Sequence, residues 1–289
     1  MATTPNDLTP NPLAQYLRTV EIHLKLPSGG EWWEQGSIDM PISGELPILP
    51  MSTRDEITLN TPDALMNGQG VVDVIHSCVP CIKNAWFTPA MDVDAILIAI
   101  RIASYGEKME YTSTCPKEDC ANTDTFEIDL RQFLDMNIDL SLFKTPIEYK
   151  GMQIHLRPIT FQTINLQNLD QYEQARMVSV INDSSLSEEQ KQTRYYEIFK
   201  NMTRYTIGNI AGSISHVVTP DGVIVNNHIH IAEFVENAER KLFKALQEKL
   251  TQINEAMPQK RVNNTCSECG NEFEVPFTFD QSNFFEFAS

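Results

Sequence analysis

Two short cysteine pairs, far apart in the chain, share one pattern and constrain the fold more than any other feature. The first pair spans Cys115–Cys120, and the alternating segment 126–130 begins six residues after it. The second pair spans Cys266–Cys269, and the alternating segment 273–277 begins four residues after it. Each copy therefore predicts a tight turn that carries two thiols, followed by a β-strand and an aromatic anchor.

Zinc chemistry calls for this arrangement. Zn²⁺ is held in structural sites by four ligands at tetrahedral corners, and thiolates are among its preferred ligands. One turn supplies two thiolates and the second turn supplies the other two. The sequence therefore predicts one structural zinc ion per chain. Short hairpins bury too little surface to be stable alone, so the metal would contribute folding free energy directly. The predicted metal ligands are Cys115, Cys120, Cys266 and Cys269.

The pattern departs from a compact zinc ribbon in two ways. Four residues separate the cysteines of the first pair, where two are usual, and residues 121–265 separate the two pairs. The ribbon would therefore be discontinuous, and strands near residues 126 and 275 would pair across it. Two alternatives stay open: four unligated thiols on two similar hairpins, or a disulfide pair.

A third pair, Cys78 and Cys81, also has the two-residue spacing. It follows a helix that we expect to end near His76, and the negative end of a helix dipole disfavours a thiolate. Buried structural cysteines are therefore favoured over a metal-ligand role or redox chemistry.

Composition excludes several classes of protein. The 289 residues include 39 acidic and 22 basic side chains, and 42% are hydrophobic, which is enough for a packed core. A chain of net charge −17 is repelled by nucleic acid and by anionic lipid. The start lacks a signal peptide, and the apolar stretch 93–103 is too short to span a bilayer. We therefore expect a soluble protein made in a cytoplasm, with reduced cysteines and without nucleic-acid, membrane or small-molecule partners.

Periodicity and turn signals predict the remaining elements. A capping box at Ser187 and Gln190 marks one helix start, and a Thr-Pro pair at residues 88–89 marks another. Hairpins are predicted over 20–26 with 37–42, over 147–156 and over 214–225. Helices are predicted over 61–76, 88–105, 161–181, 187–205 and 229–256.

These elements predict an α+β fold, with a mostly helical body, β-hairpins and a discontinuous zinc-ribbon-like module. We divide the chain into four parts on this basis. They are an N-terminal arm and β-hairpin (1–60), a buried helix pair (61–106), the zinc ribbon (107–135 plus 262–289) and a helical insertion with hairpins (136–261).

Two stretches carry a family resemblance. Residues 51–80 read MSTRDEITLNTPDALMNGQGVVDVIHSCVP, and residues 92–116 read DVDAILIAIRIASYGEKMEYTSTCP. In this order they resemble the baseplate hub protein family of T-even-type contractile-tailed bacteriophages. The resemblance covers roughly residues 20–135 and, more loosely, the C-terminal hairpin, helix and second cysteine pair. It implies a non-enzymatic tail component at the central hub, assembled in the host bacterial cytoplasm and located in the virion baseplate.

These expectations, taken together, predict the function. The sequence contains no phosphate-binding loop, nucleophile elbow or zinc-protease motif, so no catalytic residue is assigned. We expect a structural baseplate protein whose partners are other phage baseplate and tail proteins. The alternatives are an assembly chaperone that is not retained in the virion, and a zinc-ribbon regulatory or nucleic-acid module. The candidate partner-binding residues are Trp32, Trp33, Phe284, Phe285 and Phe287, and for the tryptophans packing of a loop on the core is an equal alternative.

Overall fold

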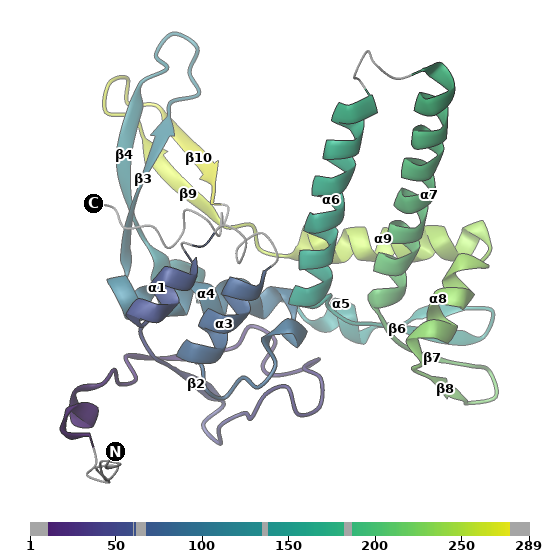
Figure 1. The fold of residues 1–289 in the computed structure, drawn as a ribbon, viewed down its shortest axis with the longest axis horizontal. Helices are drawn as coiled ribbons and strands as arrows, with labels where there is room; N and C mark the ends of the chain where they lie inside the picture. The colour runs from purple at the N-terminus through teal and green to yellow at the C-terminus, as the bar shows by residue number, and fades with distance from the viewer. Residues whose placement is uncertain (1–10, 60, 62–67, 135–137, 182–186, 278–289) are drawn as a thin grey trace, which may run out of the picture.

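The computed structural model describes residues 11–59, 61, 68–134, 138–181 and 187–277 (Figure 1). Its mixture of helices and small antiparallel sheets confirms an α+β fold. The helices are α1 (Thr53–Leu59), α3 (Gln69–Cys78), α4 (Ala90–Tyr105), α5 (Ser141–Lys144), α6 (Phe161–Ile181), α7 (Glu188–Gly212), α8 (His228–Glu236) and α9 (Arg240–Ala256), with 3-10 turns η1 (Pro12–Tyr16), η2 (Ala85–Phe87) and η3 (Leu130–Phe133). The strands are β1 (Ile22–Lys25), β2 (Glu45–Ile48), β3 (Lys108–Thr114), β4 (Thr123–Asp129), β5 (Ile147–Tyr149), β6 (Met152–Leu156), β7 (Ile214–Val218), β8 (Ile224–Val225), β9 (Arg261–Thr265) and β10 (Glu272–Pro276).

Helix α4 forms the centre of a first core cluster. It starts two residues after the predicted start at residue 88, with Pro89 at its N-cap, and it ends at the predicted residue 105, with Gly106 at its C-cap at φ 90°. Most of its faces are apolar, and Ile96, Ile98 and Ile100 are completely buried. Side chains of α3, β1, β2 and η3 pack around it.

A second core cluster lies between a four-stranded antiparallel sheet and two helices. The sheet has the order β5-β6-β7-β8, and its two predicted hairpins are confirmed. Helix α9 buries Leu242 and Leu246 at i, i+4 spacing against this sheet. The single helix predicted over 229–256 is wrong, because the chain breaks between α8 and α9, where Asn237 caps the end of α8 through its side chain.

Helices α6 and α7 form an antiparallel pair that projects from the body (Figure 1). The predicted range of α6 is confirmed. The predicted capping box is also confirmed, because Ser187 accepts from the Gln190 amide and Gln190 accepts from the Ser187 amide. Among the described residues, no helix is long and apolar enough to cross a membrane.

The first predicted hairpin is corrected. Strand β1 pairs with β2, at residues 45–48, and not with residues 37–42. A two-stranded sheet has only edge strands, so Pro47 costs no ladder hydrogen bond, while Leu46 and Ile48 face the core. Residues 37–42 instead form an isolated bridge through Ile38 and Ile82.

The predicted helix over 61–76 agrees only in its second half, since α3 begins at Gln69 after Gly68 at φ 72°. The proposed start at residues 62–67 lies outside the described residues. Cys78 is the last residue of α3, which agrees with the expectation that this cysteine pair lies at the C-terminal end of a helix.

Candidate metal centre

Each cysteine pair lies at the tip of its own β-hairpin. Strands β3 and β4 pair along their whole length and present Cys115 and Cys120 in the connecting turn. Strands β9 and β10 do the same for Cys266 and Cys269. The expected pairing of a strand near residue 126 with one near residue 275 is therefore wrong, because each strand pairs within its own hairpin.

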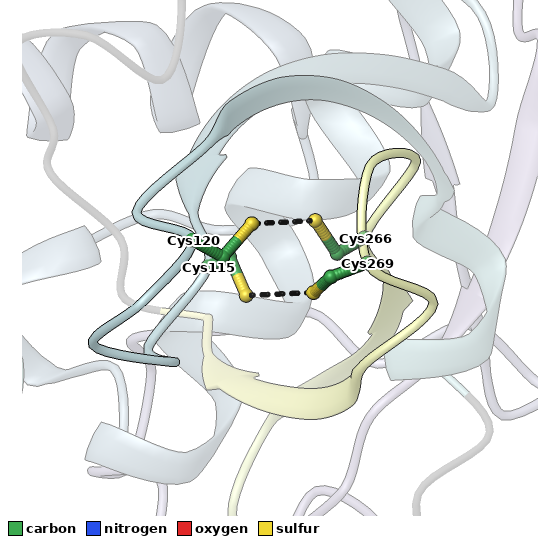
Figure 2. A group of neighbouring side chains, drawn as sticks. All are labelled: Cys115, Cys120, Cys266 and Cys269. Carbon is green, nitrogen blue, oxygen red and sulfur yellow. Dashed lines mark hydrogen bonds between the residues drawn. The ribbon is translucent and has the colours of Figure 1, made fainter.

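The two tips meet face to face, although they are far apart in sequence (Figure 2). The Sγ atoms of Cys115 and Cys269 are 3.8 Å apart, and those of Cys120 and Cys266 are 3.7 Å apart. All four sulfur atoms lie within 4.8 Å of one another. Among the described residues this is the only group of three or more metal-ligating side chains so arranged.

The sulfur positions fit a tetrahedral Zn²⁺ ion. Four sulfurs at about 2.3 Å from a central zinc stand about 3.8 Å from each other, which matches the two cross-tip distances. A disulfide needs an S–S distance of about 2.05 Å, so neither cross-tip pair is bonded. All four cysteines are free thiols. The residues present therefore suit one divalent, thiophilic ion.

Backbone hydrogen bonds shape each turn. The amide of Cys115 donates to the carbonyl of Asn122 at 2.8 Å, and that of Cys266 donates to the carbonyl of Asn271 at 2.9 Å. Gly270 adopts φ 66°, which closes the second turn with a hydrogen bond to the carbonyl of Cys266. Glycine takes this left-handed conformation without steric cost.

A carboxylate from the first hairpin holds the second turn in place. Asp124, on β4, accepts from the Ser267 amide at 3.0 Å and from its hydroxyl at 2.8 Å. In the other direction, the Asn271 side chain lies 3.9 Å from Cys115 Sγ, at hydrogen-bonding distance for sulfur. The sequence analysis missed these contacts, because no local pattern pairs residue 124 with residue 267.

Aromatic side chains support the junction below the tips. Tyr111 and Phe126 contact each other across β3 and β4, and Phe126 meets Phe273 of β10 edge to face at 6.2 Å. The Tyr111 hydroxyl also donates to the buried side chain of Asn264. The hairpins therefore contact each other through aromatic and polar side chains as well as through the cysteines.

The thiols do not ionise alike. The backbone of Cys269 donates toward Cys266 and, against the effect of burial, holds the pKa of that thiol at about 7. At Cys120 a backbone hydrogen bond from Asn122 acts to lower the pKa, but burial and the neighbouring sulfurs raise it to about 12. A bound cation would supply the positive charge that allows all four thiolates to form together.

The other predicted residues lie elsewhere. Cys78 is buried beside Arg18, and burial raises its pKa to about 12, which favours the protonated thiol over the thiolate that a metal or a disulfide exchange needs. Trp32 contacts Phe143 at 5.4 Å, and both tryptophans are half-buried in the core clusters. The remaining candidates, Phe284, Phe285 and Phe287, lie outside the described residues.

Comparison with known proteins shows a family match. The family described as T4 bacteriophage base plate protein matches residues 19–286, which include both cysteine pairs and nearly the whole chain. No curated protein and no solved structure is significantly similar to the chain.

Proposed function

The chain belongs to the T4 bacteriophage base plate protein family, and from this we propose that it is a non-catalytic structural component of the hub region of a phage tail baseplate. The match over residues 19–286 is the observation that carries the proposal. The partners would be other baseplate and tail proteins, and the protein would reach the virion after assembly in the host cytoplasm.

We further propose that one structural Zn²⁺ ion joins the two hairpin tips. The support is the spacing of the four sulfurs and their origin in two segments separated by residues 121–265. Such an ion would connect the hairpin that precedes the helical body to the hairpin that follows it. A part of a contractile tail must keep one shape under load, and a metal gives rigidity without a large core.

The division of the chain is part of the proposal. The arm and first hairpin (1–60), the helix pair (61–106) and the ribbon (107–135 plus 262–289) would share the first core cluster. The insertion (136–261) would hold most of the second. Independent unfolding of the two clusters in native-state hydrogen exchange would support this division.

Exposed apolar side chains support a role in an assembly. Tyr195, Tyr196, Phe199 and Met202 project from one side of α7 and are each at least 45% exposed. Leu13, Tyr16 and Leu17 are similarly exposed around η1. Apolar groups gathered in this way are typical of surfaces covered by a partner. A stable contact would bury more than about 1,200 Å² in total.

Mass spectrometry of purified phage particles tests the proposal. Peptides of this chain should be found in mature virions and in isolated baseplates, at a constant ratio to other baseplate proteins. Peptides found in assembly intermediates but absent from mature particles would contradict it and indicate an assembly chaperone. Binding to DNA that weakens as salt is raised would instead indicate a nucleic-acid module.

A further inference from the structure

A cavity of about 500 Å³ lies between the two core clusters. Its walls come from the start of α4, the end of α9, the bases of α6 and α7, and the segment after β6. Its volume falls in the range that holds a drug-sized ligand. Most of the wall is apolar and includes Met91, Phe133, Phe143, Leu250, Ile253 and Met257.

The charge at this cavity is opposite to that of the whole chain. Three charged residues line it, and two of them are cationic. Lys260 is paired with Asp94, so Arg157 is the second cation of the wall. Burial lowers the pKa of Arg157, and the Glu34 carboxylate, which lies outside the cavity wall, acts to raise it. The Arg157 guanidinium donates to the Gly212 carbonyl at 3.1 Å and lies 3.3 Å from His228 Nε2. Within the described part of the chain, no carboxylate forms an ion pair with Arg157.

The chain itself runs past the rim of this cavity. The ring of Phe277 stacks on Phe133 at 4.7 Å, and its amide donates to the Lys260 carbonyl at 2.8 Å. Phe133 and Lys260 both line the cavity. The described residues end at Phe277, and residues 278–289 follow it. Phe284 is seven residues further on, within roughly 23 Å of extended chain, so the segment is long enough to turn back into the cavity.

The segment beyond Phe277 has the chemistry that the cavity would accept. It contains Phe284, Phe285 and Phe287, with Glu286 placed among them. Aromatic rings suit the apolar wall, and a carboxylate suits the planar donors of an arginine. We propose that residues 278–289 dock in the cavity of their own chain, with phenylalanine rings against the apolar wall and Glu286 paired with Arg157.

Photo-cross-linking in the full-length chain tests this docking. A photoreactive benzoyl analogue replaces Phe285, and a control protein carries it at Ile42, which is fully exposed. We expect cross-links from position 285 to Met91 or Met257, on a species with the mass of one chain. The control position should give neither.

Three outcomes would overturn the proposal. Cross-links from position 285 to residues outside the cavity would place the segment elsewhere, and a yield no higher than the control would mean that it does not dock. Cross-links on a species of twice the mass would mean that the occupant is a second copy. All three are independent of zinc content and of presence in the virion, so they leave the proposed function untouched.

A matched pair of variants tests the ion pair. Arg157→Gln removes the cationic group of the cavity, whereas Arg131→Gln removes an exposed arginine that is paired with Glu107. We expect the cross-link yield to fall in Arg157→Gln and to stay unchanged in Arg131→Gln. Equal yields in the two variants would overturn the pairing of Glu286 with Arg157.

Discussion

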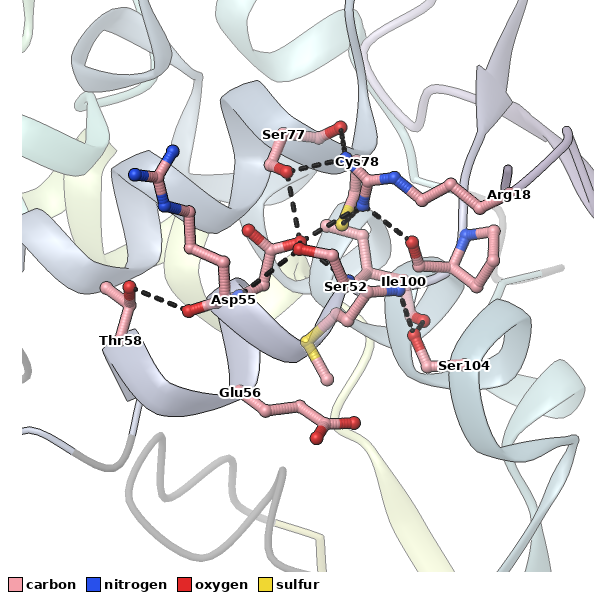
Figure 3. A network of polar contacts seen from close by, with 12 residues as sticks. Arg18, Ser52, Asp55, Glu56, Thr58, Ser77, Cys78, Ile100 and Ser104 are labelled. Carbon is pink, nitrogen blue, oxygen red and sulfur yellow. Dashed lines mark hydrogen bonds and ion pairs between the residues drawn. The ribbon is translucent and has the colours of Figure 1, made fainter. Parts of the chain in front are cut away.

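Arg18 and Asp55 form an ion pair across 37 positions of sequence, with Arg18 Nη1 lying 3.0 Å from Asp55 Oδ2 (Figure 3). The same guanidinium donates to the Pro50 carbonyl at 2.8 Å and to the Ser77 carbonyl at 2.9 Å. The Asp55 carboxylate also accepts from the amide and hydroxyl of Ser52 and from the hydroxyl of Ser77. This network fixes the N-terminal segment against the start of α1 and the end of α3.

Removing the charge of Asp55 should destabilise the protein. The Asp55 side chain is only 7% exposed, and in Asp55→Asn an amide would face donors that now meet a carboxylate oxygen. Hydrogen bonds to charged groups contribute about 1.5–3 kcal/mol each, so we expect a loss of about 2 kcal/mol in the free energy of unfolding, measured by urea titration. Asp39→Asn serves as the control, because its pair with Lys83 is solvent-exposed and should cost less than about 1 kcal/mol. Equal losses would contradict the importance of the network.

The same carboxylate should make stability depend on pH in the acid range. Burial acts to raise the pKa of Asp55, but hydrogen bonds from Ser52 and Ser77 and the charge of Arg18 together lower it below its ordinary value of 3.8. As the pH falls below about 4, the unfolded chain binds a proton at this position before the folded chain does. The stabilisation is therefore complete above that pH and is lost as the pH falls through the folded pKa. The unfolding free energy of the wild type should drop more steeply than that of Asp55→Asn, and parallel curves would refute this account.

Local signals in the sequence predict much of the fold. The capping box at Ser187 fixes a helix start through contacts only three residues apart, and the helical period fixes α6. The spacing of the cysteines likewise selects the four thiols that the structure brings together. The capping box and the helical period act within one turn or one short segment, and so does the spacing within each cysteine pair, whereas the contact between the two pairs spans residues 121–265.

Contacts that form only through tertiary packing could not be predicted from local sequence signals. Strand β2 contains Pro47, and a proline within a segment favours a connector over a strand. The strand is possible because its sheet has two strands, both of them edges, and this is known only from the structure. The break after α8 has neither glycine nor proline to mark it. Contacts such as that of Asp124 with Ser267 join exposed polar residues, and nothing in either segment indicates the other.

The four clustered cysteines should bind about one zinc ion per chain. Cys120→Ser and Cys266→Ser each remove one ligand, so zinc measured by plasma mass spectrometry should fall well below one equivalent, and the unfolding temperature should fall with it. Cys81→Ser is the matched control, since Cys81 lies outside the cluster, and it should keep its zinc. Metal that is lost from Cys81→Ser and retained in Cys120→Ser would show that the ligands are assigned wrongly.

Asp124 should tune the affinity for the metal without binding it. Its carboxylate fixes Ser267, the residue directly after a proposed ligand, and loss of such supporting groups typically lowers metal affinity about 10- to 100-fold. Asp124→Ala should therefore lose zinc to a competing chelator at a concentration at least about tenfold lower than the wild type. Asp119→Ala removes an exposed carboxylate within the first turn and should leave the competition curve in place.

Metal removal should loosen the hairpin tips and leave the centre of the fold intact. At the tips themselves, the two hairpins meet through the cysteines and through the contact of Asp124 with Ser267. Further from the tips, Phe126 meets Phe273 edge to face. The base of each hairpin is held separately, because Ile128 and Val262 belong to the first core cluster. After chelation we expect faster hydrogen exchange at the amides of Cys115 and Cys266, whose hydrogen bonds close the turns, and unchanged protection along α4. Equal loss of protection in α4 would mean that the metal holds the whole core together, whereas no change at the tips would mean that the hairpins keep their arrangement without it.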